Sequence, residues 1–211
     1  MAIRLKLLAP LAVLIWLGSI VALAEDELPI AADDFIYCTV CHGIQLMGNP
    51  IIKAPRLSGM DAWHVEQQLV SFKKGLRGTH VDDPAGYEMQ PMVAALSDDQ
   101  ISEVASFVNA TRSPAPVITI SGDVVKGKTY YSTCAACHGV DGSGNSALGS
   151  PDLTTTDDWY QVTQLRNFKS GSRGSHPGDT YGMQMRAAAQ LLADEQAIID
   201  VVSYISTLQN N

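Results

Sequence analysis

Apolar residues along this chain recur mostly at helical spacing. In residues 61–74, Val65, Leu69 and Phe72 fall at i, i+4 and i+7, which predicts a helix with one apolar side. Other helices are predicted over 31–41, 123–137 and 157–169. This pattern predicts an all-α fold.

Each half of the chain is expected to end with a further helix that follows a long loop. Glycine and proline favour turns, and they predict the loop of the first half through Gly75, Gly78, Pro84 and Gly86. The last helix of that half begins at Ser97, where Gln100 can complete a capping box. The second half has Ala193 at the position of Ser97, so Asp194 is expected to cap the helix instead.

The sequence matches itself when it is shifted by 96 residues. The matched pairs include Pro55/Pro151, Trp63/Trp159, Gln68/Gln164, Arg77/Arg173, His80/His176 and Met89/Met185. Matches spread over so much of the chain predict a duplicated domain rather than a duplicated motif. We expect domains at 25–112 and 119–211, joined by a proline-spaced linker at 113–118 and related by a pseudo-twofold axis.

The N-terminal residues 1–24 differ in character from the rest of the chain. Arg4 and Lys6 precede an uncharged, mostly apolar run that ends in Ala-Leu-Ala, and acidic residues follow. This pattern predicts a secretory signal peptide, and an uncleaved membrane anchor is the alternative. Both interpretations place the remaining residues outside the cytoplasmic membrane, in the periplasm, either soluble or anchored.

The chain is acidic, with a formal net charge of −8 at pH 7. This charge argues against nucleic acid as a partner. It favours either a basic docking surface on a partner protein or a general role in solubility.

The four cysteines all belong to two C-x-x-C-H motifs. These motifs are formed by Cys38, Cys41 and His42, and by Cys134, Cys137 and His138. The pattern predicts covalent attachment of one c-type haem (iron) to each motif, with the histidine as an iron ligand. A zinc site or a redox dithiol is the alternative. The wide separation of the pairs and the histidine after each second cysteine favour two haem groups per chain.

The second iron ligand must come from elsewhere in each copy. Met89 and Met185 are equivalent in the repeat, and each precedes a leucine by seven residues, so we expect them to be the distal ligands. Met92 and Met183 are alternatives, as are the equivalent histidines His80 and His176, which are otherwise expected to form hydrogen bonds near the haem or within the loop. His64 has Tyr160 as its counterpart and is expected to be a surface residue on a helix.

These motifs resemble those of the dihaem class I cytochromes c of the cytochrome c4 type, over residues 30–209. The resemblance implies two tandem cytochrome c domains, each wrapped around its haem. It also implies that each C-x-x-C-H histidine donates a hydrogen bond to the carbonyl of Pro55 or Pro151, and that Met89 and Met185 are ligands. Trp63 and Trp159 stand where the family has an aromatic residue near the haem, although a core role would also explain them. The apolar residues 43–47 of the first copy could bury its haem or line a docking surface.

The expected function is one-electron transfer between respiratory partners, since two filled axial positions leave the iron no place for a substrate. The partners would be redox proteins, such as a membrane-bound oxidase or dehydrogenase. A dihaem enzyme with one labile iron ligand and a membrane-anchored subunit of a respiratory complex are the alternatives. The expected protein is therefore a carrier and not an enzyme.

Overall fold

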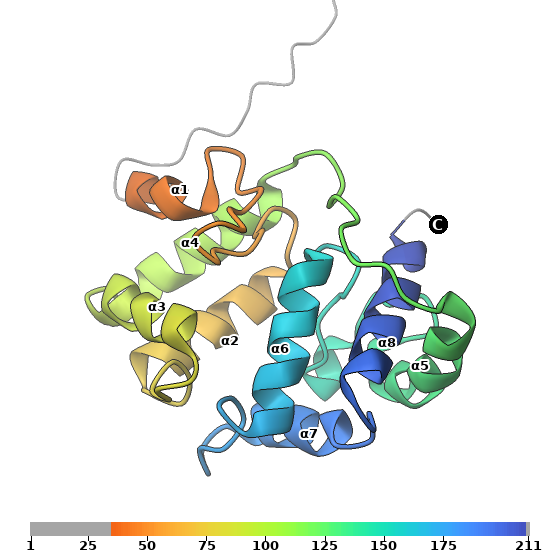
Figure 1. Ribbon diagram of the computed structural model, residues 1–211. Coiled ribbons are helices and arrows are strands. Elements are labelled where there is room, and N and C mark those ends of the chain that lie inside the picture. Colours follow the sequence, from red (N-terminus) through yellow and green to blue (C-terminus); the bar gives the residue numbers. More distant parts are fainter. Residues whose placement is uncertain (1–34, 210–211) are drawn as a thin grey trace, which may run out of the picture.

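A computed structural model describes residues 35–209, which form eight α-helices and no β-strand (Figure 1). The first copy contains α1 (Ile36–His42), α2 (Ala62–Lys73), α3 (Pro84–Ala94) and α4 (Asp98–Ala110). The second contains α5 (Val124–His138), α6 (Asp158–Ser170), α7 (Thr180–Ala189) and α8 (Glu195–Leu208), with a short 3-10 helix η2 (Ser146–Leu148). The all-α prediction is confirmed. The predicted signal peptide at 1–24 lies outside the described residues.

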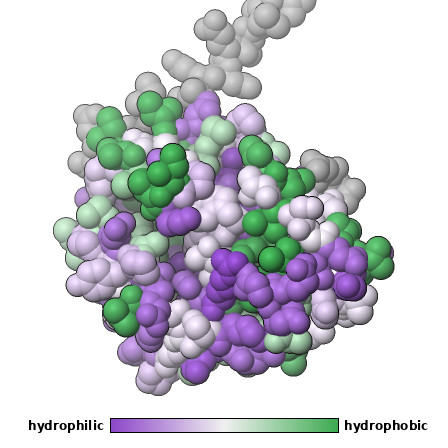
Figure 2. All heavy atoms as spheres, viewed as in Figure 1, coloured by the Kyte–Doolittle hydropathy of each residue, from purple (hydrophilic) through white to green (hydrophobic). Residues whose placement is uncertain are grey.

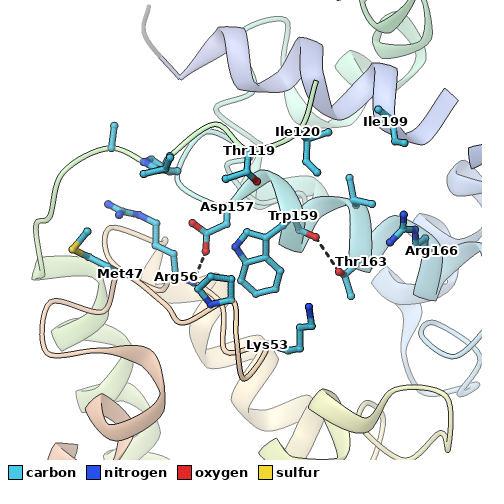
Figure 3. Close-up of a pocket in the computed structure, with 15 residues that line it drawn as sticks. Met47, Lys53, Arg56, Thr119, Ile120, Asp157, Trp159, Thr163, Arg166 and Ile199 are labelled. Atoms are coloured by element: carbon cyan, nitrogen blue, oxygen red, sulfur yellow. Dashed lines mark hydrogen bonds between the residues drawn. The ribbon is translucent and has the colours of Figure 1, made fainter. Parts of the chain in front are cut away.

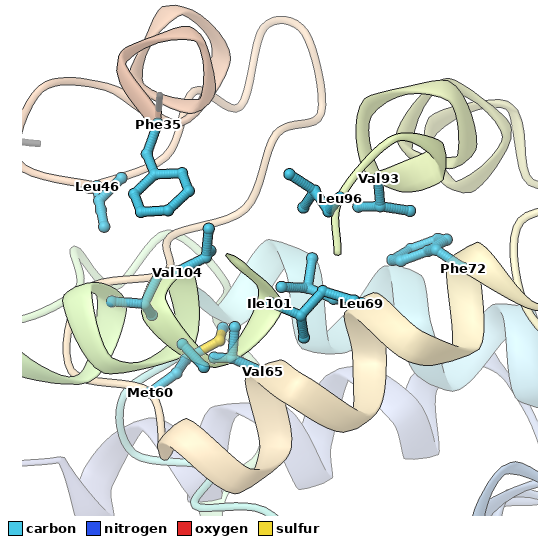
Figure 4. Close-up of a cluster of buried hydrophobic side chains, with 12 residues drawn as sticks. Phe35, Leu46, Met60, Val65, Leu69, Phe72, Val93, Leu96, Ile101 and Val104 are labelled. Atoms are coloured by element: carbon cyan, nitrogen blue, oxygen red, sulfur yellow. The ribbon is translucent and has the colours of Figure 1, made fainter. Parts of the chain in front are cut away.

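The hydrophobic core of the first copy forms where α2 packs against α3 and α4. Val65, Leu69 and Phe72, the predicted apolar side of α2, are all buried in it (Figure 4). Phe35 and Leu46 face each other at one edge of the same cluster (Figure 4). Burial of large apolar side chains is the main favourable term in such a core, at about 1.5–3 kcal/mol for each.

The core of the second copy forms where α8 packs against α5 and α6. Its centre is the apolar side of α8, with Ile198, Val201, Val202 and Ile205 all almost inaccessible to solvent. Tyr131 from α5 closes this cluster, and it stands where the first copy has Phe35.

The helix caps follow the sequence closely. Ser97 and Gln100 form the predicted capping box at the start of α4. Asp194 caps α8, where its side chain accepts a hydrogen bond from the backbone N–H of Ala197. Both cap predictions are confirmed.

The predicted long loop between the second and last helix of each copy is wrong, because much of it is helical. Pro84 is the first residue of α3, a position where its missing N–H costs nothing and its fixed φ suits a helix. Asp83 caps this helix by accepting the N–H of Gly86. The candidate methionines of each copy therefore lie on a helix and not in a loop: Met89 and Met92 on α3, and Met183 and Met185 on α7.

Helices α2 and α6 lie side by side at the centre of the molecule and bring the two copies together (Figure 1). Gln68 of α2 accepts hydrogen bonds from Arg77 at 2.7 Å and from Arg173 of the other copy at 2.8 Å. Gln164 of α6 does the same with Arg173 at 2.6 Å and Arg77 at 3.2 Å. This reciprocal pattern is what a pseudo-twofold relation between the copies produces.

The surface carries scattered apolar side chains, which form separate patches on the face shown in Figure 2. In the first copy, the residues after the C-x-x-C-H motif include Ile44 and Ile51, with 80% and 88% of their surface exposed. Within residues 35–209, no helix is long and apolar enough to cross a membrane.

Candidate haem-binding sites

Each C-x-x-C-H motif lies at the C-terminal end of a helix, α1 or α5. A spacing of three or four residues brings side chains to the same face of a helix, so both thiols and the histidine can meet one ligand. Cys41 and Cys137 are exposed, whereas Cys38 and Cys134 are half-buried. The histidines point inward, since only 5% of His42 and 6% of His138 is exposed.

One hydrogen bond fixes the ring of each motif histidine. His42 Nδ1 lies 2.7 Å from the carbonyl oxygen of Pro55, and His138 Nδ1 lies 2.9 Å from that of Pro151. A carbonyl can only accept, so Nδ1 carries the proton and Nε2 keeps its lone pair for a metal ion. These are the bonds that the family resemblance implies.

Burial keeps both imidazoles in the form that can bind iron. Burial lowers the pKa of His42 and of His138, and the hydrogen bond to the proline carbonyl only partly offsets this effect. Both rings are therefore neutral at neutral pH, as a metal ligand must be.

The loop after each motif is folded so that its proline reaches the histidine. Gly48 donates its N–H to the carbonyl of His42, and Asn49 pairs with Ala54 in an isolated β-bridge. The second copy repeats the bond from Gly144 to His138 and the bridge between Asn145 and Ser150.

The structure distinguishes the candidate methionines by their exposure. Met89 and Met185 are half-buried, and Met89 packs against the first core. Met92 and Met183 are 48% and 40% exposed.

A lysine from α2 or α6 binds the chain just after the helix that carries the candidate methionines. Lys73 Nζ donates to the carbonyl of Leu96 at 2.6 Å, and Lys169 makes the same contact with Leu192. Sequence reasoning missed this role, although both pairs match at the repeat offset and could have indicated it.

The histidines His80 and His176 lie on exposed turns. Each Nδ1 accepts the backbone N–H of the residue two positions later, Asp82 or Gly178. These contacts give the two rings a local role in the loop.

The expectation that His64 is a surface residue is wrong. Its Nδ1 atom is shielded from solvent without a hydrogen-bond partner, because this side of α2 meets the other copy. Burial and then the positive charges of Arg173 and Arg77 lower the pKa of His64 to about 3. The ring is therefore neutral and lies edge-on to Trp63, with the ring centroids 5.5 Å apart.

Trp63 and Trp159 belong to neither buried core cluster. Trp159 lines a groove of about 520 Å³ between residues 47–56, the linker and α6 (Figure 3). Lys53 lies 6.0 Å from the centre of its ring. None of the predicted iron ligands lines this groove.

The residues present fit haem. Each copy offers two thiols and a neutral imidazole with a free Nε2, and a thioether on helix α3 or α7 of the same copy. At the contact between the copies, Arg77 Nε and Arg173 Nε are both buried without a partner. Burial and then the charge of Arg77 lower the pKa of Arg173 to about 9, because its positive charge is incompletely compensated there. An anion at this place, such as a haem propionate, would stabilise that charge. Within residues 35–209, no cluster of three or more His, Cys, Asp or Glu side chains suits a zinc ion.

Sequence comparisons agree with this arrangement. The family model described as Cytochrome c matches twice, over residues 35–112 and 124–209. A thiosulfate dehydrogenase electron acceptor of Stutzerimonas stutzeri is 31% identical over 161 residues, 71% of each chain. A cbb3-type cytochrome c oxidase subunit FixP of Rhizobium etli is 32% identical over 123 residues. That match covers 56% of this chain and 41% of the relative.

Two solved structures have the same fold. Cytochrome c4 of Acidithiobacillus ferrooxidans aligns with a TM-score of 0.66 at 26% identity, over 83% of this chain and 99% of that one. Reduced recombinant cytochrome c4 of Pseudomonas stutzeri aligns with a TM-score of 0.63 at 25% identity, over 81% and 93%. The chain belongs to the cytochrome c family, as a two-domain member of the cytochrome c4 type with two covalently bound haem groups.

Proposed function

We propose that this dihaem cytochrome carries single electrons in the periplasm between respiratory partners, and that it is not itself an enzyme. The observation that carries the proposal is the duplicated, neutral histidine held by a proline carbonyl, together with a half-buried methionine at the equivalent position of each copy. When bound, haem supplies a one-electron iron couple whose potential depends on its axial ligands.

Met89 and Met185 are the proposed distal ligands. They are less exposed than Met92 and Met183, and they are equivalent in the repeat. A thioether favours ferrous iron and raises the reduction potential. Filling both axial positions leaves no site for a substrate, which supports a carrier over an enzyme.

The relatives indicate the kind of partner. One relative is named as the electron acceptor of a thiosulfate dehydrogenase, and another as a subunit of a cbb3-type oxidase. We therefore propose that the donor or acceptor is a membrane-bound oxidase or a dehydrogenase. The exposed Ile44 and Ile51, in the loop beside the first haem-binding motif, offer an apolar surface for its approach.

The experiment that tests the ligand assignment uses four methionine variants of the holoprotein. Met89→Ala should abolish the ferric iron–thioether absorption of one haem, and Met185→Ala that of the other. Met92→Ala and Met183→Ala are the matched controls and should keep both absorptions. Loss of an absorption in a control variant would show that the assignment is wrong.

Binding of carbon monoxide distinguishes the carrier from an enzyme with a labile iron ligand. A closed ferrous haem should bind carbon monoxide slowly and weakly in the wild type. Rapid binding to one haem of the wild type would favour the enzyme alternative. Determination of the N-terminal residue of the mature protein distinguishes a diffusing carrier from an anchored subunit, because cleavage after Ala24 would remove the apolar segment that could serve as an anchor.

A further inference from the structure

The start of helix α3 depends on one buried carboxylate. Asp83, only 4% exposed, caps the helix by accepting the N–H of Gly86 on Oδ1 at 3.2 Å. The helix backbone comes so close that a Cβ at Gly86 would lie 2.2 Å from Asp83 Oδ2. Asp83 Oδ2 itself is buried without a partner. A cap that is so enclosed fixes the helix that carries Met89.

The second copy reaches this cap directly. Asn167, on α6 and 9% exposed, donates from Nδ2 to the same Oδ1 of Asp83 at 3.2 Å. The two residues are 84 positions apart, and the contact crosses the boundary between the copies. A buried carboxylate that loses a donor keeps the cost of its desolvation without compensation, so the contact matters to the cap.

Among the described residues, the cap of α7 in the second copy receives no matching contact from the first copy. Ser71 stands where the second copy has Asn167, and Asp179 stands where the first has Asp83. Asp179 caps α7 by accepting the N–H of Gly182 at 2.9 Å. Among the described residues, no hydrogen bond joins the Ser71 side chain to Asp179. A serine side chain is one heavy atom shorter than that of asparagine and carries no amide donor.

We propose that Asn167 is a positioning residue for the distal side of the first haem. By donating to Asp83, Asn167 stabilises the first turn of α3. We expect this to slow the displacement of Met89, which the same helix carries. The docking of the second domain thereby strengthens one iron ligand and not the other. This inference rests on the proposed assignment of Met89 as a ligand.

The test compares Asn167→Ala with its matched control Ser71→Ala in the holoprotein. The first readout is amide hydrogen exchange at Gly86, which does not depend on the iron. The second is the rate at which imidazole displaces the distal ligand of each ferric haem, with the haems distinguished by NMR. Asn167→Ala should accelerate both Gly86 exchange and displacement at the first haem by about three- to tenfold, which corresponds to the loss of one hydrogen bond. Ser71→Ala should leave both haems unchanged.

Two further variants separate positioning from general loosening. Asp83→Asn keeps an oxygen that can accept from both Gly86 and Asn167 but removes the negative charge that acts on Arg173, so it should accelerate displacement less than Asp83→Ala. Asp83→Ala removes the acceptor and should accelerate displacement at the first haem at least as much as Asn167→Ala. The inference is overturned if Asn167→Ala leaves displacement at the first haem unchanged, or accelerates it equally at both haems. Failure of the ligand assignment is distinguishable, because Met89→Ala would then leave the iron–thioether absorption intact.

Discussion

Leu46 and Gly142 occupy equivalent positions in the two copies, and both have a positive φ, 54° and 81°. Glycine adopts this left-handed region freely, whereas an L residue pays about 1–2 kcal/mol for it. Leu46 is nevertheless fully buried and packs beside Phe35 (Figure 4). Burial of the leucine side chain offsets the backbone strain, which explains why an apolar loop replaces the glycine-containing one in the first copy.

Leu46→Gly should destabilise the first domain. The change relieves the strained φ but removes a buried side chain, and truncation of a buried leucine to alanine alone costs about 2–5 kcal/mol. We expect a net loss of about 1–3 kcal/mol in the free energy of unfolding. Urea unfolding followed at each haem measures this loss. Ile44→Gly, in the same loop but 80% exposed, is the control and should change stability less.

Tyr131→Phe should destabilise the second domain by about 1 kcal/mol, the usual net value of one hydrogen bond. Tyr131 donates its hydroxyl to the carbonyl of Gly139 at 2.8 Å, directly after the haem-ligand histidine. The turn bond from Gly142 to this carbonyl is long, at 3.4 Å. In the first copy, Leu46 already donates to the carbonyl of Gly43 at 2.9 Å, so Phe35 needs no hydroxyl. Phe35→Tyr should therefore bring no stabilisation, and a gain in that variant would contradict this explanation.

Most of the fold could be predicted because each element has a local signal. The apolar spacing of Val65, Leu69 and Phe72 predicts α2, and the Ser97 capping box marks the start of α4. Helix α3 was not predicted, because proline and glycine, as at Pro84 and Gly86, usually indicate turns. Here the proline begins the helix, and the glycine makes room for the Asp83 carboxylate. Only the three-dimensional arrangement shows whether these two residues form a turn or begin a helix.

The equivalent loops of Arg77 and Arg173 are expected to help form the contact between the copies, and both arginines lie there. Periodicity alone does not predict which residues they meet. Gln68 and Arg173 are far apart in sequence, and their contact depends on how α2 and α6 dock. The same docking buries the Nδ1 atom of His64, which the sequence of α2 alone places on a polar helix face. The residues of the haem sites were easier to predict from the sequence, because each motif and its proline lie within one short segment.

The stability of the protein should fall as the pH drops below 6.5, in part because of His64. In the folded protein the pKa of His64 is lowered from its ordinary value of 6.5 to about 3, first by burial and then by Arg173 and Arg77. The unfolded chain therefore binds one more proton than the folded protein between these values. This proton contributes a slope of up to about 1.4 kcal/mol per pH unit.

His64→Gln removes the titration and should flatten the dependence of the unfolding free energy on pH between 4 and about 6.5. Carboxylates titrate alike in both proteins, so the difference between the two curves isolates His64. Parallel curves for the wild type and the variant would show that this ring is not shielded as the structure places it.

The two domains should exchange electrons faster than either exchanges them with reagents in solution. Arg77 and Arg173 meet at the contact between the copies, where each guanidinium bonds both Gln68 and Gln164 and each Nε is buried without a partner. The loops at 44–47 and 140–143 differ, which should give the haems distinct potentials. Rapid mixing of the oxidised protein with substoichiometric reductant should show prompt reduction, followed by redistribution to the haem of higher potential.

The double variant Gln68→Leu/Gln164→Leu should slow this redistribution without changing the rates of external reduction. Each lost amide weakens the docked arrangement by about 1.5–3 kcal/mol, because the bonds involve charged guanidinium groups. The wild-type result is decisive for the relay itself. If electrons stayed where the reductant first placed them, the domains would be independent carriers, whatever the variant did.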